Sequence, residues 1–300
     1  MSGYLKILRA GPLATIQDMG RIGNLRYGIA ASGPMVRSAF RAAGAMLERA
    51  GDAGIEFTPT GIEFSVDTTT SAGFCGGAFK LSVNGEPAPW NAAHALAPGD
   101  RINIAPGNWG NYGYVRFEHE LDVPPLLGSR STNSTVGLGG FDGRPLLAGD
   151  RIPFGAPGNS APLQGDVPNE PQSLPIRVIW GLHADLFPTA MRRAFLEATF
   201  RVSKRLDRMG VRLDGGDFFR EARILSLVSD AVVPGDIQIL GDGTPIVLMR
   251  DHQPTGGYPR IATVISADMD RFAQLRPGTP VKFEPVTLAH ALLAAEGENR

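Results

Sequence analysis

A mostly β fold of the α+β class is predicted, organised as two β-rich domains that each contain one or two helices. Three observations lead to this prediction. Short stretches of alternating apolar and polar residues recur along the 300 residues, glycine (38) and proline (24) mark many tight turns, and few stretches show helical spacing. Many turns in a chain that is 43% hydrophobic indicate many short, packed elements rather than disorder.

Strands are expected where this alternation is bounded by turn residues. Residues 62–66 and 79–83 each place three apolar side chains on one face. Asn84-Gly85, directly after the second stretch, predicts a two-residue hairpin. The same pattern predicts further strands at residues 101–105, 113–117, 176–180, 246–249, 262–266 and 281–284.

Helical spacing is found in four stretches. In the first of them, Ser32 is the candidate N-cap and Pro34 lies near the first turn. The expected helices cover residues 35–47, 188–198, 267–275 and 287–295.

A glycine turn that leads into a strand recurs at Gly99, Gly149 and Gly278, which suggests related strands in a closed or nearly closed sheet. One segment, by contrast, is rich in Pro, Gly, Asn and Gln and carries no periodicity. We therefore expect this segment, residues 156–174, to be a linker between domains at residues 1–155 and 175–295.

Composition excludes several classes of protein. A net charge of −1 leaves no basic surplus for nucleic-acid binding, and no apolar run approaches the length of a membrane span. The N-terminus becomes polar too early for a signal peptide, and the single cysteine excludes an internal disulfide. A cytoplasmic globular protein is expected, with Cys75 as a buried structural thiol rather than a nucleophile.

Standard catalytic signatures are absent from the sequence. It contains no Walker A loop, dinucleotide fingerprint, His-Glu-x-x-His motif, Cys-x-x-Cys pair or Gly-x-Ser-x-Gly elbow. The five histidines lack the spacing of metal ligands, so no metal site is expected. The glycine run at residues 137–140 is interpreted as a turn rather than a phosphate loop.

Four segments place polar side chains beside glycines. Glycine lets the backbone approach a ligand, Gln and Asp can read an amide, Arg can hold a carboxylate, and Tyr adds a donor. This chemistry suits a small amide or carboxylate substrate, whereas the alternative is a set of turns whose side chains cap their own backbone. The segments are Gln17-Asp18-Met19-Gly20-Arg21, Gly128-Ser129-Arg130-Ser131-Thr132, Asp207-Arg208-Met209-Gly210, and residues 251–259 with the sequence Asp-His-Gln-Pro-Thr-Gly-Gly-Tyr-Pro.

In this order, the segments resemble the allophanate hydrolase subunit 2 family, which includes the C subunit of 5-oxoprolinase, KipA-type proteins and the carboxyltransferase half of the biotin-dependent urea carboxylase. The resemblance runs from about Leu8 to Pro285. Its further motifs are Ser32-Gly33-Pro34-Met35, Ile55-Glu56, Gly143-Arg144-Pro145-Leu146 and Val233-Pro234-Gly235-Asp236-Ile237-Gln238.

The resemblance implies cyclophilin-like β-barrels and a partner subunit of the KipI-like, allophanate hydrolase subunit 1 type. It also implies a small amide, lactam or carboxylate substrate. No cofactor is expected to be bound covalently, because the chain has no Met-Lys-Met-like biotin attachment motif. ATP, carboxybiotin or both would be supplied through partner proteins.

Two functions follow from the resemblance. The first is a subunit of a heteromeric hydrolase or carboxyltransferase of the 5-oxoprolinase or urea-carboxylase type, inactive without its partner. The alternative is a KipA-type regulatory protein that sequesters a KipI-like partner.

The candidate site residues come from the matching motifs. The expected catalytic residues are Arg21, Gln253, Tyr258 and Asp251, with Asp251 either a base or a brace of its loop. The expected substrate-binding residues are Gln17, Asp18, Gly20, Ser129, Arg130, Thr132, Asp207, Arg208, Gln238, Thr255, Gly256 and Gly257.

Three positions depart from the family pattern. Val36 replaces an Asp, Glu118-His119-Glu120 follows the strand at residues 113–117 where relatives carry Gly-Gly, and Pro254 replaces a Thr and removes an N–H donor. These departures leave the true substrate open.

Overall fold

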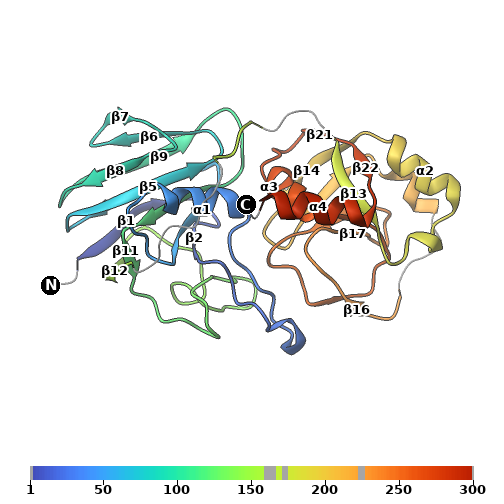
Figure 1. Ribbon diagram of the computed structural model, residues 1–300, viewed down its shortest axis with the longest axis horizontal. Coiled ribbons are helices and arrows are strands. Elements are labelled where there is room, and N and C mark those ends of the chain that lie inside the picture. Colours follow the sequence, from blue (N-terminus) through green and yellow to red (C-terminus); the bar gives the residue numbers. More distant parts are fainter. Residues whose placement is uncertain (1–2, 159–166, 171–174, 222–226, 299–300) are drawn as a thin grey trace. The chain divides into compact units, whose positions relative to one another are not determined.

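The computed structural model describes residues 3–158, 167–170, 175–221 and 227–298. The chain divides into two compact units, the first formed by Met1–Ile22 and Ala31–Glu170, the second by Gly23–Ala30 and Pro171–Arg300. Figure 1 shows both units. The linker predicted at residues 156–174 lies largely outside the described residues, so this boundary stays a prediction.

Two antiparallel sheets build the first unit and enclose its core. Apolar side chains that alternate along the strands, such as Phe64 and Phe117, fill the space between them. The seven-stranded sheet has the order β11 (His119–Leu121), β12 (Arg151–Pro157), β1 (Tyr4–Ala10), β4 (Ile62–Val66), β9 (Arg101–Pro106), β6 (Phe79–Val83) and β7 (Glu86–Ala88). The five-stranded sheet has the order β2 (Thr15–Gln17), β3 (Gly54–Phe57), β10 (Gly113–Phe117), β5 (Thr70–Gly76) and β8 (Ala93–Leu96).

Helix α1 (Arg37–Ala45) packs against β5 and β10. The N–H groups at its N-terminal end bond to side chains that are distant in the sequence. The Met35 N–H donates to the Glu56 carboxylate (2.8 Å) and the Val36 N–H donates to the Tyr114 hydroxyl (2.8 Å). Ser32 has φ 56° and lies outside the helix, so its predicted role as the N-cap is wrong. Buried groups on neighbouring strands satisfy these donors instead.

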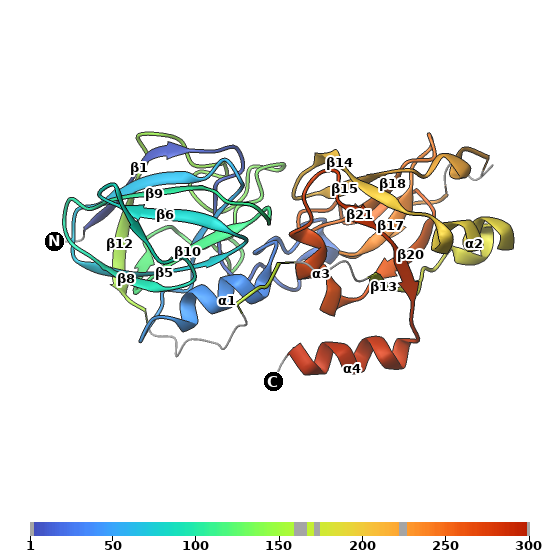
Figure 2. The same ribbon diagram turned by 90° about the horizontal axis from the view of Figure 1, so that it is seen from above.

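The second unit contains one large sheet that curls into a barrel-like form, seen in Figure 2. Its described part holds three α-helices, α2 (Thr189–Glu197), α3 (Ser266–Ala273) and α4 (Leu288–Glu298). Each lies at a stretch with predicted helical spacing, although one or two helices were expected in each domain. The strand order is β21 (Pro280–Val281), β14 (Phe200–Leu206), β15 (Gly210–Asp214), β18 (Pro245–Leu248), β17 (Asp236–Ile239), β20 (Arg260–Val264), β13 (Ile176–Trp180) and β22 (Phe283–Pro285). Short 3-10 turns lie at Leu25–Tyr27, Ala184–Leu186 and Asp217–Glu221, and β16 (Asp230–Ala231) pairs with β19 (Thr255–Gly256).

The mostly β class is confirmed, and most predicted elements are found close to their expected bounds. Asn84 and Gly85 both have positive φ in the β6–β7 hairpin, as the dipeptide predicts. The strand expected at residues 262–266 ends earlier because Ser266 already begins α3. The strand expected at residues 281–284 is two short strands, because β21 pairs with β14 while β22 pairs with β13.

Two of the three recurring glycine turns are completed by an aspartate, whereas Gly278 is followed by Thr279. At Gly99 and Gly149 the glycine has φ above 90°, and the next residue, Asp100 or Asp150, accepts a hydrogen bond from the N–H three residues earlier (2.7 Å in both turns). A further copy at Gly235-Asp236, in which the Val233 N–H donates to Asp236 (3.0 Å), was not predicted. These turns fix the start of β9, β12 and β17.

No helix in the described ranges is long and apolar enough to cross a membrane.

Candidate functional site

A groove of about 610 Å³ lies on one face of β14, β15, β18 and β17 in the second unit. On β15 and β18 the lining residues alternate because successive side chains on a strand point to opposite faces, whereas Lys204, Arg205 and Leu206 of β14 are consecutive. Apolar floor positions include Ile246 and Leu248 on β18. Gln253 and Tyr258, from the loop between β18 and β20, complete the lining.

Gln238 is the buried polar group of this groove. Its side chain is 1% exposed, and its Oε1 accepts a long hydrogen bond from Gln253 Nε2 (3.4 Å). Its Nε2 has no hydrogen-bond partner among the described residues. Opposite Gln238 the register of β20 shifts by one residue, and such bulges often re-aim side chains beside functional sites. An unpaired buried donor costs about 1–3 kcal/mol, and this Nε2 atom lies against Gly256, where an added Cβ would be 2.4 Å away.

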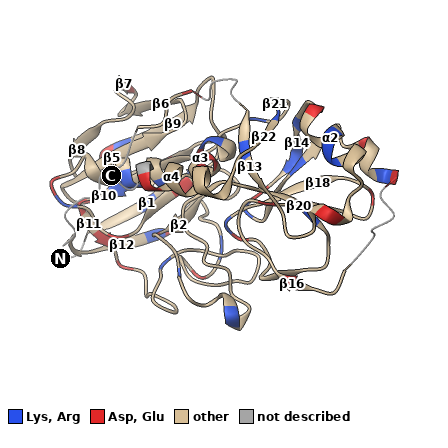
Figure 3. Ribbon diagram, turned by 45° about the vertical axis from the view of Figure 1, so that its right-hand side comes forward, with Lys and Arg blue, Asp and Glu red and all other residues tan. Residues whose placement is uncertain are grey.

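The groove is rich in positive charge. Lys204, Arg205 and Arg212 line it, and none of the three forms an ion pair with another residue in the described ranges. Figure 3 shows blue segments along β14, where two of them lie. One carboxylate, Asp207, also lines the groove, but its Oδ1 accepts hydrogen bonds from the Met209 and Gly210 N–H groups (2.8 and 3.1 Å). The groove therefore favours an anion.

The structure brings four sequence-predicted residues together here: Asp207, Gln238, Gln253 and Tyr258. It adds Lys204, Arg205 and Arg212, which sequence reasoning missed. Lys204 and Arg205 lie in a basic stretch, residues 201–205, for which no strand was predicted, and Arg212 lies outside this stretch.

Thr255, Gly256 and Gly257 do not line the groove but lie behind it. Thr255 and Gly256 form β19, and the Gly257 carbonyl accepts a hydrogen bond from the Leu227 N–H (2.6 Å). Gly256 packs so closely on Gln238 that an added Cβ would lie 2.4 Å from Gln238 Nε2. Their expected contact with substrate stays a prediction, while their packing supports the groove wall.

The base of the same loop is fixed by His252. Its Nδ1 lies 2.6 Å from the Gln253 carbonyl oxygen. Burial lowers the pKa of His252, so the ring is neutral at pH 7 and Nδ1 donates this hydrogen bond. Pro254, which replaces the usual Thr, presents its carbonyl to the Val232 N–H (3.2 Å).

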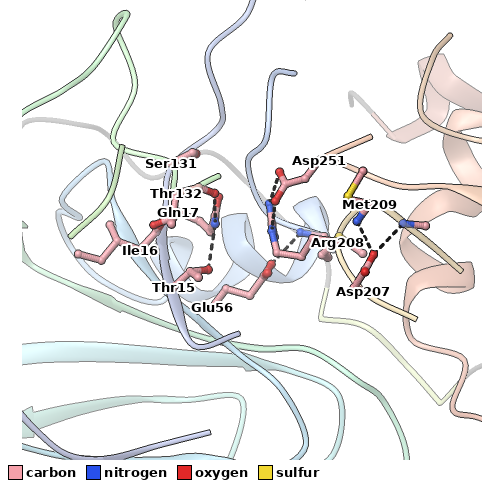
Figure 4. Close-up of polar contacts among 12 residues, drawn as sticks. Thr15, Ile16, Gln17, Glu56, Ser131, Thr132, Asp207, Arg208, Met209 and Asp251 are labelled. Atoms are coloured by element: carbon pink, nitrogen blue, oxygen red, sulfur yellow. Dashed lines mark hydrogen bonds and ion pairs between the residues drawn. The ribbon is translucent and has the colours of Figure 1, made fainter. Parts of the chain in front are cut away.

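Arg208 and Asp251 form a buried ion pair, drawn in Figure 4. Arg208 Nε donates to Asp251 Oδ2 (2.8 Å) and Nη2 donates to Oδ1 (3.1 Å). The two side chains are 3% and 1% exposed, and neither lines the groove. The Asp251 N–H also donates to the Arg208 carbonyl (2.7 Å), so the pair joins the β14–β15 hairpin to the end of β18. This geometry is that of a brace, the second of the two roles expected for Asp251.

In the first unit, Asp18 organises most of the remaining predicted residues. Its carboxylate accepts hydrogen bonds from the hydroxyls of Ser129 and Ser131 (2.5 and 2.6 Å) and from the N–H groups of Gly20 and Arg130 (2.9 and 2.5 Å). Burial alone would raise the pKa of Asp18, but these hydrogen bonds hold it below its usual value. The carboxylate therefore joins two loops and is ionised at pH 7.

Gln17 and Thr132 extend this network. Gln17 Nε2 donates to Thr15 Oγ1 and to the Thr132 carbonyl (2.9 and 3.1 Å), as Figure 4 shows, and Thr132 Oγ1 donates to the Ile16 carbonyl (2.9 Å). Gln17 Oε1 has no hydrogen-bond partner among the described residues.

Arg21 and Arg130 both donate to backbone carbonyls. Arg21 is buried and its Nη2 donates to the Ser131 carbonyl, while Arg130 Nε donates to the Val123 carbonyl (2.9 Å). These contacts brace turns. A role for either guanidinium in orienting a substrate carboxylate stays a prediction.

We expect Asp18→Asn to lower the free energy of unfolding at pH 7 by about 1.5–3 kcal/mol, because an amide cannot replace a carboxylate that accepts four hydrogen bonds. The folded pKa of Asp18 lies below its unfolded value, so its stabilisation is complete above the unfolded pKa of about 4 and is lost as the pH falls through the folded pKa. Urea unfolding is repeated at pH values down to about 3, and the difference in the free energy of unfolding between wild type and variant should shrink as the pH falls. The exposed Asp185, changed to Asn, is the control, and a gap for Asp18→Asn that does not change with pH would contradict the role.

Cys75 is buried, as predicted, and burial raises the pKa of its thiol to about 12. Across the described residues, no group of three or more His, Cys, Asp or Glu could hold a metal ion. The departures Val36 and His119 lie in the first unit, where Val36 precedes α1 and His119 Nδ1 lies 3.1 Å from Thr70 Oγ1.

Comparison with known proteins identifies the family. Residues 27–285 match the model of the carboxyltransferase domain, subdomains A and B. The chain belongs to this carboxyltransferase-domain family. The resemblance to the C subunit of 5-oxoprolinase and to urea carboxylase is thereby confirmed.

The family includes relatives of two kinds. The C subunit of 5-oxoprolinase from Escherichia coli strain K12 is 34% identical over 99% of this chain and 96% of its own length, and that of Haemophilus influenzae is 32% identical over 96% and 93%. The urea amidolyase of Lachancea kluyveri is 28% identical over 98% of this chain but only 17% of its own length. The crystal structure of Kluyveromyces lactis urea carboxylase superposes with a TM-score of 0.89 at 25% identity, covering 99% of this chain and 28% of that one. This chain therefore spans less than a third of the urea-processing proteins.

Proposed function

We propose that this chain is a subunit of a heteromeric enzyme of the 5-oxoprolinase type, which opens a small lactam or related amide together with a KipI-like, subunit 1-type partner. The observation that supports this most is its likeness to the C subunit of 5-oxoprolinase over nearly the whole length of both proteins. Urea amidolyases match at lower identity and over a small part of their length.

The groove suits this activity. Gln238 and Gln253 offer amide groups that can pair with an amide or lactam, and a site built to hydrogen-bond such a group discriminates against analogues that lack it. Tyr258, which is half-exposed at the groove, adds a phenol donor. The cations of Lys204, Arg205 and Arg212 can stabilise negative charge on a bound substrate.

ATP and carboxybiotin are proposed to reach the site through partner proteins. The glycine run at residues 137–140 does not fit a phosphate cradle, because the Leu138 N–H donates to the Asn133 carbonyl and the Gly140 N–H donates to the Arg130 carbonyl (3.0 and 2.9 Å). These donors are engaged within the first unit. Two of the four N–H groups in this run are therefore not free to bind a phosphate.

The first test is whether activity requires the partner. We expect the isolated chain to hydrolyse 5-oxoproline with ATP at a rate on the order of a hundredfold or more below that of the assembled complex, because catalytic groups from several subunits must be positioned together. Co-expression with the adjacent reading frames, followed by product analysis, measures this. Full activity of the isolated chain would contradict the proposal. A complex that forms without any lactam or amide turnover would favour the KipA-type regulatory function.

A further inference from the structure

One face of the seven-stranded sheet in the first unit is open. Along β1, β4, β6, β9 and β12, alternate side chains join the apolar core, so the residues between them point away from it. The α-helix of this unit, α1, packs on the other sheet, against β5 and β10, as Figure 2 shows. The outward side chains of the seven-stranded sheet therefore form a surface of their own, the open face.

Three cations lie in one row across the open face. In the strand register, Arg151 of β12 pairs with Lys6 of β1, and Ser65 of β4 lies between Lys6 and Arg101 of β9. All three charged residues are exposed. Because neighbouring strands lie about 4.8 Å apart, the row extends for about 14 Å.

Two more cations and one carboxylate complete the open face. Arg9 of β1 lies opposite Glu63 of β4, and its Nη2 donates across the sheet to Asn103 Oδ1 (3.0 Å). Lys80 of β6 is exposed. These five strands therefore present five cations and one carboxylate, a local charge of +4, in a chain whose net charge is −1.

Nearby carboxylates neutralise part of this charge. Glu63 Oε1 accepts a hydrogen bond from Arg101 Nε (2.5 Å), and Asp67, just after β4, lies 3.9 Å from the Arg151 guanidinium. The two lysines of the open face form no ion pair with a residue in the described ranges. Their ammonium groups are available to a partner.

The open face is broad, and small side chains separate its charges. The outward positions between the cations include Ser65, Ser82, Ala105 and Pro153. Four strand spacings, about 19 Å, separate the cations of β12 and β6, which is farther than one small anion reaches. Glu120 and Asp122 lie beside Gly155, at the end of β12 away from Arg151. The open face therefore fits an extended anionic surface.

The pattern of charges favours a protein over a nucleic acid. Glu63 lies among the cations and would repel a phosphate backbone, whereas a protein can place a cation of its own opposite Glu63. The Tyr4 ring is covered by the Arg151 guanidinium (4.6 Å to the ring centre), so it offers no free surface on which a base could stack. Complementary charge patterns of this kind orient two proteins and speed their association.

We infer that the open face binds an acidic surface of the subunit 1-type partner. This inference rests on the partner in the proposed function, and a relative named as a subunit of 5-oxoprolinase supports a protein as the occupant. The five cations are the contact residues on this chain. Partner binding is thereby assigned to the first unit, whereas the groove belongs to the second.

The salt dependence of partner binding is the first measurement. The full-length chain is bound to the partner encoded by the adjacent reading frame, and Kd is measured by biolayer interferometry between about 50 mM and about 300 mM salt. We expect Kd to rise on the order of tenfold over this range, because salt screens exposed charges. Lys6→Glu and Lys80→Glu should each weaken binding at low salt on the order of tenfold, mainly through a slower association rate.

A matched control is Lys282→Glu, which makes the same change of charge at an exposed residue of the second unit. It should change Kd by less than about twofold. All three variants should unfold thermally like the wild type, because Lys6 and Lys80 have no ion pair with a described residue to lose. An equal loss of binding in the control, or no loss in either variant of the open face, would overturn the inference.

Two further outcomes would also overturn it. One is the absence of any complex between the wild-type chain and this partner. The other is binding of a duplex DNA oligonucleotide that is tighter than binding of the partner and is abolished by Lys6→Glu, since the open face would then bind a nucleic acid.

Turnover by the complex separates this inference from the proposed function. If the two variants of the open face weaken the complex but the wild-type complex opens no lactam, the binding surface stands and the proposed enzymatic function is wrong. If the wild-type complex hydrolyses 5-oxoproline and neither variant affects its assembly, the function stands and the binding surface is wrong.

Discussion

Arg208→Met is expected to lower the free energy of unfolding by about 3–5 kcal/mol, the largest effect on stability that we predict for a single residue. Arg208 gives Asp251 two hydrogen bonds in a region where both side chains are almost fully buried. Removing the guanidinium leaves the Asp251 carboxylate inside the protein without these donors. Methionine preserves most of the side-chain length, so the loss reports the charge rather than a cavity.

The measurement is urea unfolding of the full-length chain at pH 7. Arg220→Met is the matched control, since Arg220 and Asp217 are an ion pair with 70% and 80% exposed side chains, and such pairs contribute less than about 1 kcal/mol. If Arg208→Met unfolds like this control but loses turnover in the complex, Arg208 contacts substrate instead and the interpretation of the pair as a brace is wrong.

Much of the fold was predictable because it is encoded locally. Alternation within β4, β6 and β10 is a property of five consecutive residues, and Asn84-Gly85 fixes its hairpin through two backbone conformations. Features that depend on distant residues were not predictable. The α1 cap comes from Glu56 and Tyr114, so no reading of the residues around Ser32 could have found it.

The candidate site likewise contains residues that could be predicted from the sequence and residues that could not. The glycine-flanked polar segments contain three of the groove residues, Asp207, Gln253 and Tyr258, and the family motif at residues 233–238 contains a fourth, Gln238. Their contact with substrate stays a prediction. The same signal also selected residues that bond to their own chain, because a polar side chain beside a glycine can either bind a ligand or cap a turn. Asp18 is the example: its four hydrogen bonds all come from the protein.

The cations of the groove could not be predicted from local sequence. Lys204, Arg205 and Arg212 carry no motif, and the face on which a strand presents its residues is set by sheet curvature and bulges. One irregularity interrupts β14 between Val202 and Leu206, where the register against β15 shifts. Such shifts change which residues face a groove without leaving a local sequence signal.

Gly256→Ala should displace the Gln238 amide from its present position and so weaken lactam binding and turnover by on the order of tenfold or more. The new Cβ would lie 2.4 Å from Gln238 Nε2 and 3.4 Å from Gln238 Cδ and Val232 Cγ1. Because Gln238 is buried, its amide has little room to retreat, and we expect the variant to lose about 1–3 kcal/mol of stability as well. Affinity for 5-oxoproline and urea unfolding measure the two effects.

Two further variants show whether the effect passes through Gln238. Gly241→Ala is the matched control, since nothing lies within 4 Å of its added Cβ and its φ is not positive, so it should change stability by less than about 0.5 kcal/mol. Shortening Gln238 to Ala removes the clash with the new Cβ. In that background the stability cost of Gly256→Ala should therefore fall by about 1 kcal/mol or more. A double-mutant cycle measures this coupling. If Gly256→Ala costs as much stability in that background, Gly256 supports β19 or Val232 instead. The position of the Gln238 amide then does not depend on the absence of a side chain at residue 256.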